Sequence, residues 1–138
     1  MELTEKQKTG LNIALQRYKA GEKCTVISGY AGTGKSTTVK FIVSALKQEN
    51  EELTDEDFCF CAYTGKATAV LQSKGNKNCL TLHKLLYKNE PLPDGTFIRL
   101  LKEQLSYKII IVDEVSMAPM SLMKDLFSFE GIYVLCLR

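Results

Sequence analysis

A Gly-rich stretch near the start of the chain, Gly29-Tyr-Ala-Gly-Thr-Gly-Lys-Ser36, fits the pattern G-x-x-x-x-G-K-[ST] at every position. Phosphate oxygens need several backbone N–H groups pointing at them, and glycines allow the close approach and the backbone angles that this requires. In this pattern the lysine ammonium contacts the β- and γ-phosphates, and the final hydroxyl binds Mg²⁺. A chance Gly-rich turn is the alternative, but the complete match indicates a nucleotide site. The residues expected to contact the nucleotide are Gly29, Gly32, Thr33, Gly34, Lys35, Ser36 and Thr37.

A pair of acids follows an aliphatic run in IIIVDEVSM, residues 109–117. Such a run is typical of a buried strand, and open α/β sheets bind ligands at the carboxyl ends of their strands. Asp113 is therefore expected to hold Mg²⁺ together with Ser36, directly or through water. Glu114 is expected to accept a proton from the attacking water, so Glu114 and Lys35 are the candidate catalytic residues. A solvent-facing pair at a strand end is the alternative.

Helices and strands around these motifs are predicted from hydrophobic spacing. A helix over residues 4 to about 20 has apolar side chains at mostly helical intervals, and Gly21 ends it. Residues 24–29 are expected to form a buried strand and residues 36–47 an amphipathic helix, which is the context that the Gly-rich pattern requires. Two further strands, at residues 58–63 and 109–113, are each too apolar to have one face in water, so we expect a parallel sheet covered on both faces, an α/β fold. Residues 132–137 are expected to form a fourth strand.

The composition is that of one globular domain. The chain has 138 residues, of which 45% are hydrophobic and 25% charged, and its formal net charge is +2. The sequence contains neither an apolar run long enough for a membrane helix nor a signal-peptide core, so we expect a cytoplasmic protein. Its five cysteines include no C-x-x-C pair, which favours reduced thiols in the core. Cys59 and Cys61 are expected to pack on one face of a strand rather than to bind a metal.

Charge is unevenly distributed along the chain. Residues 49–57 contain six acids and no base, which predicts a solvated loop. Residues 58–89 contain five lysines and no acid. Such a local positive field can bind a phosphate backbone, although lysines also populate ordinary solvated surfaces.

Five stretches of the chain occur in the order and approximate spacing found in one protein family. They are LTEKQKTGL, GYAGTGKST, CAYTGKATAVL, TLHKLL and IIIVDEVSM. Through them nearly the whole chain resembles the first motor domain of superfamily 1 DNA helicases of the 5′-to-3′ branch, which includes RecD-like and Dda-like enzymes. The resemblance implies a RecA-like P-loop NTPase fold, a three-layer sandwich with a mainly parallel sheet. It places the strand at 132–137 between those at 24–29 and 109–113.

The same resemblance implies ATP and Mg²⁺ as cofactors and single-stranded DNA as the partner. It further implies ATP hydrolysis coupled to 5′-to-3′ translocation and duplex unwinding. Gln7 falls where the family recognises adenine, whereas from the residues alone it would be a surface glutamine. Two motifs that touch DNA in the family match Tyr63, Thr64, Gly65 and Lys66, and then Thr81 and His83.

Two of these DNA assignments depend on the resemblance more than on the residues themselves. Related sequences often have Ala-Pro-Thr at the first motif, so Tyr63 differs from the pattern, although an aromatic ring could stack on a base. A lone histidine such as His83 is usually structural, and the resemblance alone suggests a DNA contact.

The segment at residues 89–99 carries Pro91, Pro93 and an Asp-Gly pair. Helicases of this branch often insert a strand-separating hairpin near this place. Because the segment is short and rich in turn-forming residues, we expect a plain loop.

Some parts of the family pattern are missing. Arg138 stands where the family has the glycine of a G-D-x-x-Q motif, and the charge-stabilising arginines and the second motor domain lie further downstream in the family. Arginines of this kind contribute on the order of 10³–10⁵ in rate. Residues 1–138 are therefore expected to be a truncated, N-terminal part of a motor domain that binds ATP but hardly turns it over. A small P-loop kinase and a nucleotide-binding interaction module without affinity for single-stranded DNA are the alternatives.

Overall fold

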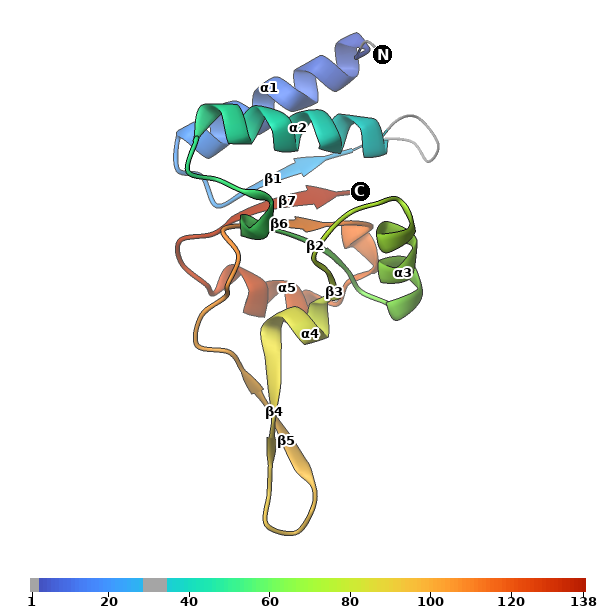
Figure 1. The fold of residues 1–138 in the computed structure, drawn as a ribbon, viewed down its shortest axis with the longest axis vertical. Coiled ribbons are helices and arrows are strands. Elements are labelled where there is room, and N and C mark those ends of the chain that lie inside the picture. The colour runs from blue at the N-terminus through green and yellow to red at the C-terminus, as the bar shows by residue number, and fades with distance from the viewer. Residues whose placement is uncertain (1–2, 29–34) are drawn as a thin grey trace.

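A parallel sheet forms the centre of the structure, a computed structural model that describes residues 3–28 and 35–138. Within these residues five parallel strands pair in the order β1-β7-β6-β2-β3 (Figure 1). The predictions of a parallel α/β sheet and of a central position for β7 between β1 and β6 are confirmed. The strands are β1 (Cys24–Ile27), β2 (Phe58–Ala62), β3 (Cys79–Thr81), β6 (Ile109–Val112) and β7 (Tyr133–Leu137).

Helices cover both faces of the sheet and give three layers (Figure 1). The helices α1 and α2 pack on one face, α4 and α5 pack on the other, and α3 lies beside β2 and β3. In the described part of the chain, no helix is both long enough and apolar enough to cross a membrane. The helices are α1 (Glu5–Lys19), α2 (Lys35–Glu49), α3 (Gly65–Ser73), α4 (Leu82–Leu86) and α5 (Met120–Phe127), with 3₁₀ turns at Asp55–Asp57 and Val115–Met117.

The first helix begins and ends where its sequence predicts. The Thr4 hydroxyl accepts a hydrogen bond from the Gln7 N–H (3.2 Å), and the Gln7 side chain accepts one from the Thr4 N–H (2.8 Å). This reciprocal pair satisfies two of the backbone donors near a helix start. At the other end Gly21 has a φ of 77°, a conformation that favours glycine and ends the helix.

The central strands are buried along their whole length, as their continuous apolar sequences predict. Successive residues of β6 point to opposite faces. Ile109 and Ile111 pack with α1 and α2, whereas Ile110 and Val112 pack with α4 and α5. One short run of aliphatic residues therefore joins both halves of the core.

The cysteines pack in the core, as predicted. Four of them are buried and Cys24 is partly buried. The sulfur atoms of Cys59 and Cys61 lie 3.6 Å apart on the face covered by α4 and α5. The hydrogen bond with Cys59, together with burial, raises the pKa of the Cys61 thiol well above its ordinary value. This thiol therefore stays protonated and unreactive at neutral pH.

The acidic segment between α2 and β2 is mostly exposed, as predicted, but it has more structure than a simple loop. It contains the 3₁₀ turn at Asp55–Asp57, and the Leu53 side chain is buried. Asp55 forms an ion pair with Lys47 and lies 3.8 Å from the Lys77 ammonium. The hydrogen bond and charge of Lys47 lower the pKa of the Asp55 carboxyl.

Replacement of Leu135, in the middle of β7, tests whether the layer between the sheet and helices α1 and α2 is part of the core. Its side chain has no exposed surface and packs under α1 and α2. We expect Leu135→Ala to lower the free energy of unfolding by about 3–4 kcal/mol, because the lost burial and the remaining cavity both destabilise the fold. Leu100, which is 40% exposed, provides the control. Leu100→Ala should cost about 1 kcal/mol or less. Urea denaturation measures both values, and equal losses would contradict the assignment.

The segment after α4 is a β-hairpin, so the predicted plain loop at residues 89–99 is wrong. The hairpin extends away from the three layers (Figure 1). In its turn the Asp94 side chain accepts a hydrogen bond from the N–H two residues on (2.9 Å), and Gly95 has a φ of 88°. Pro91 is tolerated because both strands of a hairpin are edge strands, where a missing N–H does not interrupt a sheet. The two antiparallel strands are β4 (Tyr87–Pro91) and β5 (Phe97–Leu101).

Candidate nucleotide and nucleic-acid site

The candidate site lies at the edge of the sheet where the carboxyl ends of the strands meet. Asp113 and Glu114 follow β6, Tyr63 and Thr64 follow β2, and Thr81 ends β3. The start of α2 lies on the same side of the molecule (Figure 1). Because all strands of the sheet run in one direction, residues that are far apart in the sequence converge here, as is usual for ligand sites in open α/β sheets.

The structure describes the Gly-rich motif only in part. Lys35 and Ser36 begin α2, and their side chains are outside what the structure describes. Thr37, in the same helical turn, is partly buried. Helix starts attract phosphate groups through their N–H groups and dipole, so the position of this helix suits the predicted role. The predicted contacts that lie outside the described residues are Gly29, Gly32, Thr33 and Gly34.

The two acids after β6 occupy different environments. The Asp113 N–H donates to the Cys61 carbonyl (2.8 Å), which continues the pairing with β2 by one residue. The Asp113 Oδ1 accepts a hydrogen bond from the Glu114 N–H (3.0 Å). Glu114 itself has a φ of 49° and a ψ of 51°, a left-handed conformation that is uncommon for such a side chain and is often found at functional sites. The chain turns sharply here and leaves Glu114 exposed beside Asp113.

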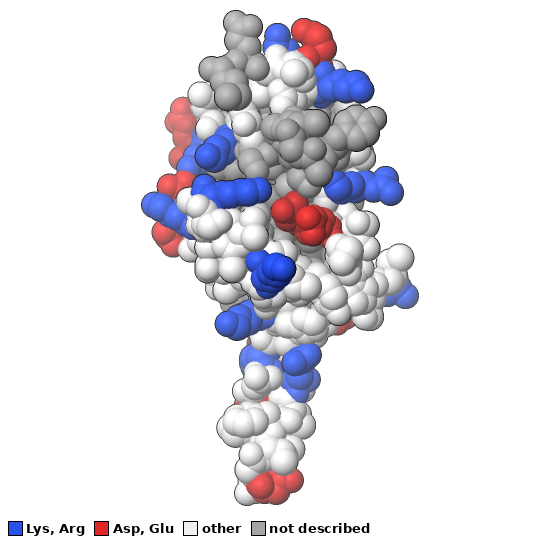
Figure 2. Space-filling view, turned by 90° about the vertical axis from the view of Figure 1, so that its right-hand side faces the viewer, with Lys and Arg blue, Asp and Glu red and all other residues white. Residues whose placement is uncertain are grey.

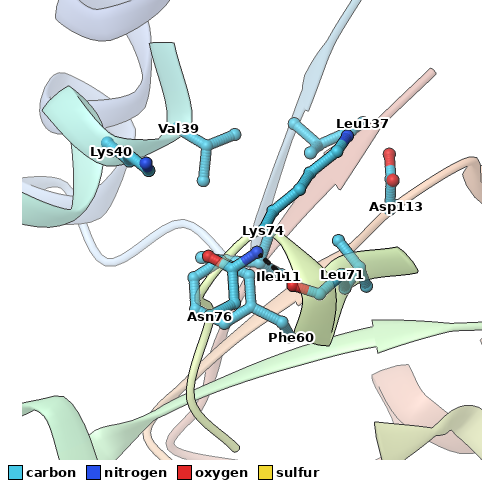
Figure 3. A pocket seen from close by; sticks show the side chains of 9 residues that line it. All are labelled: Val39, Lys40, Phe60, Leu71, Lys74, Asn76, Ile111, Asp113 and Leu137. Carbon is cyan, nitrogen blue, oxygen red and sulfur yellow. Dashed lines mark hydrogen bonds between the residues drawn. The ribbon is translucent and has the colours of Figure 1, made fainter. Parts of the chain in front are cut away.

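A pocket of about 350 Å³ opens beside Asp113 (Figure 3). Its apolar wall includes Phe60 and Ile111, and Lys40 of α2 lies across from them. The Lys74 side chain extends across the pocket toward Asp113 (Figure 3). The volume is at the lower end of the range for ligand pockets. An anionic ligand at this edge would therefore meet two lysines in addition to the expected Lys35.

Gln7, the candidate adenine contact, has a structural role in the free chain. It lies at the end of α1 that is on the same side of the molecule as the start of α2 (Figure 1). Its side-chain oxygen accepts the hydrogen bond from the Thr4 N–H. An adenine contact could use the amide NH₂ group or the second lone pair of the oxygen without breaking this bond.

The threonines of the predicted DNA motifs cap helices at this edge. The Thr64 hydroxyl accepts a hydrogen bond from the Ala67 N–H (3.1 Å) at the start of α3, and the Thr81 hydroxyl accepts one from the Lys84 N–H (3.2 Å) at the start of α4. Gly65 is the first residue of α3. Each threonine hydroxyl keeps its own hydrogen, which can be donated to a phosphate oxygen. The caps are therefore compatible with a contact to a DNA backbone.

His83 brings the two predicted DNA motifs together. Its ring centre lies 6.0 Å from that of Tyr63 and 6.0 Å from that of Tyr87. Lys66 and Lys84 are exposed, and neither has a carboxylate partner among residues 3–28 and 35–138. Figure 2 shows this face, with separate basic side chains around a central acidic patch. Aromatic rings beside exposed lysines are the combination that binds single-stranded nucleic acids.

Three residues of this region are absent from the sequence predictions of the site. Phe60 is predicted only as part of a strand, although it lines the pocket. Lys74 belongs to the lysine-only stretch, and nothing local in the sequence indicates that it reaches toward Asp113. Tyr87 follows His83 by four positions, which is the spacing of neighbours on one helix face, and this spacing could have identified it.

Comparisons with known proteins are consistent with this arrangement. A family model described as an AAA domain matches residues 12–130. The ATP-dependent DNA helicase Dda of Enterobacteria phage T4 is 32% identical over 130 residues, covering 92% of this chain and 29% of that protein. The ATP-dependent RecD2 DNA helicase of Deinococcus radiodurans is 36% identical over 109 residues, covering 79% of this chain and 14% of that protein.

A solved structure has the same fold. The crystal structure of the Pif1 helicase from Candida albicans matches with a TM-score of 0.61 and 18% identity, covering 99% of this chain and 32% of that one. At this identity the match shows the fold alone. The chain spans less than a third of the length of each of these three proteins. From its domain match and its relatives, the chain belongs to the AAA-domain family that matches residues 12–130 and to the superfamily 1 DNA helicases, where it corresponds to the N-terminal region.

Proposed function

We propose that the chain binds Mg-ATP at the carboxyl edge of its sheet, and that in a whole helicase ATP hydrolysis there drives 5′-to-3′ translocation on single-stranded DNA and duplex unwinding. The observation that carries the proposal is the convergence of the start of α2 with Asp113 and Glu114 at this edge. Similarity to proteins named ATP-dependent DNA helicases supports the choice of nucleotide and of nucleic acid.

Each residue of the nucleotide site has a separate role in this proposal. Ser36 and Asp113 hold Mg²⁺, for which hydroxyl and carboxylate oxygens are suitable ligands. Lys35 neutralises the β- and γ-phosphates, and Gln7 contacts adenine through its amide. Held there, Mg²⁺ would supply charge neutralisation for the phosphates. Glu114 accepts the proton of the attacking water, which its exposed position beside Asp113 allows.

The DNA strand is proposed to cross the same edge over α3 and α4. Threonine hydroxyls and helix-start N–H groups would contact the phosphates, while Tyr63 and His83 would face a base. In a whole helicase a second motor domain would close on ATP. Its DNA-binding surface would then move relative to the DNA-binding surface of this domain. The β4–β5 hairpin lies where this branch of the family carries a strand-separating hairpin, and we assign it that role. The proposed contacts are Tyr63, Thr64, Gly65, Lys66, Thr81 and His83.

Titration of a fluorescent single-stranded oligonucleotide tests the DNA proposal. His83→Ala is expected to weaken binding roughly 5- to 30-fold, because a lost base contact costs about 1–2 kcal/mol. Lys66→Ala should weaken binding and lower the slope of log affinity against log salt by about 0.7, since one phosphate contact is lost. Lys124→Ala, at an exposed position of α5 outside the proposed contacts, is the control and should change neither quantity.

The outcomes separate the alternatives. Unchanged affinity in both His83→Ala and Lys66→Ala would remove the proposed DNA surface. Binding of Mg-ATP without any binding of the oligonucleotide would support the interaction module instead. Transfer of the γ-phosphate to a small acceptor would support the kinase.

A further inference from the structure

Tyr87 connects three parts of the molecule through one side chain. It is the residue at which α4 ends and β4 begins, and its N–H donates to the His83 carbonyl. Its ring centre lies 6.0 Å from that of the His83 ring and 5.9 Å from the Arg99 guanidinium of β5. Its hydroxyl donates a hydrogen bond to the Asp125 carboxylate of α5. Tyr87 therefore contacts α4, the hairpin and α5.

The rest of the hairpin base is attached to α4. The Lys102 N–H donates to the Leu86 carbonyl (2.8 Å), and the Lys102 ammonium donates to the Lys84 carbonyl (3.0 Å). Leu82, Leu85 and Leu86 fix α4 in the core. Beyond this base the hairpin extends away from the layers (Figure 1). An isolated two-stranded hairpin is marginally stable in water, so its direction depends on how its base is held.

The contact between Tyr87 and Asp125 suits a permanent anchor. Burial, followed by the hydrogen bond to Asp125, raises the pKa of Tyr87 to about 12. A phenol is protonated at neutral pH even without this rise, so it donates the hydrogen bond, and a carboxylate acceptor makes such a bond shorter and stronger than a neutral one. The Arg99 guanidinium lies over the same ring, so a cation–π contact joins the second strand of the hairpin to Tyr87.

We propose that Tyr87 is a positioning residue that, through Asp125 and Arg99, fixes the direction of the β4–β5 hairpin relative to α4 and α5. The consequence for DNA rests on the proposed function: a base contact at His83 and the strand-separating hairpin would be held at one fixed distance from each other. The positioning itself does not depend on DNA.

Nuclear magnetic resonance of the ¹⁵N-labelled chain without DNA tests the positioning role. Residual dipolar couplings report whether the hairpin and sheet amides share one orientation, and relaxation reports how rigidly the hairpin is held. In Tyr87→Phe, which keeps the ring and removes the hydroxyl, the order parameters of the hairpin amides are expected to fall from about 0.85 to about 0.6, with the sheet unchanged. Asp125→Ala, which removes the acceptor, should give the same result. The double variant should show no further fall.

Tyr107→Phe is the matched control. Tyr107 lies in the segment that leads from the hairpin to β6, and its hydroxyl has no hydrogen bond among the residues that the structure describes. This variant should leave the residual dipolar couplings and the order parameters of the hairpin amides unchanged. A hairpin that keeps its single orientation and its order parameters in both Tyr87→Phe and Asp125→Ala would overturn the proposal. If Tyr87→Phe does not fold, Asp125→Ala alone decides, because it changes only the acceptor on a partly exposed helix position.

Oligonucleotide titration distinguishes this inference from the proposed function. Asp125→Ala leaves the side chains of His83, Tyr87 and Lys66 in place, so its affinity for single-stranded DNA should stay within about twofold of the original, well below the loss from one base contact. Loss of hairpin order together with absent DNA binding in the unchanged chain would support the anchor and reject the DNA function. Normal DNA binding with an unchanged hairpin in both variants would reject the anchor alone.

Discussion

Lys35→Ala is expected to abolish the thermal stabilisation that Mg-ATP gives the protein. At a ligand concentration of about 100 Kd, that stabilisation amounts to about 2.7 kcal/mol, or roughly 8 °C in Tm for a domain of this size. The ammonium of Lys35 is the cation that its motif directs at the β- and γ-phosphates. Alanine removes this charge and is a strong helix former, so α2 should still begin at this position. Differential scanning fluorimetry with and without Mg-ATP measures the shift.

Lys124→Ala provides the control for this experiment as well, because it removes the same charge from an exposed position on α5. Its shift with Mg-ATP should equal that of the original chain. A full shift in Lys35→Ala would contradict the assignment of the Gly-rich stretch to phosphate binding. The Tm of Lys124→Ala without nucleotide should stay close to that of the original chain, since Lys124 is exposed.

Asp113→Asn is expected to raise the Mg²⁺ concentration that half-saturates ATP binding by at least roughly tenfold to hundredfold, the loss typical even for groups that only support a metal's ligands. The side chain keeps its shape and can still accept the hydrogen bond from the Glu114 N–H, so the turn after β6 should persist. What is lost is one negative charge close to the expected metal. Titration of Mg²⁺ at constant ATP, followed by the thermal shift, measures the change.

Glu114→Gln is the matched comparison, because it makes the same change of carboxylate to amide one residue later. Glu114 is exposed and is assigned to the attacking water, so Mg-ATP binding should be retained in this variant. An equal rise in the Mg²⁺ concentration needed for ATP binding in both variants would contradict the separate roles of the two acids. An unchanged Mg²⁺ requirement in Asp113→Asn would show that Asp113 is not part of the metal site.

Much of the fold follows from local sequence patterns. The aliphatic runs of β6 and β7 predict strands buried on both faces, and both are buried throughout. The start of α1 follows from Thr4 and Gln7, and its end from Gly21. These features depend on residues that are close together in the chain, so composition and spacing are sufficient to predict them.

Short elements are less visible in the sequence, and α3, β3, α4 and α5 are missing from its predictions. The helix α4 has five residues, too few to be stable by helix propensity alone. It forms because Leu82, Leu85 and Leu86 are buried against the sheet. The hairpin is missed for a related reason. Its prolines and Asp-Gly pair indicate a turn, but the pairing of β4 with β5 joins residues on either side of that turn.

The sequence by itself determined the class of fold, the family and the types of residue that could bind a nucleotide, because each depends on a contiguous motif. Only the tertiary structure decided which distant residues share a site. It brings Lys74 toward Asp113, and it brings Tyr87 into contact with both Arg99 and Asp125. The physical reason is that these contacts depend on the order of strands in the sheet and on helix packing across it, which no local spacing of residues encodes.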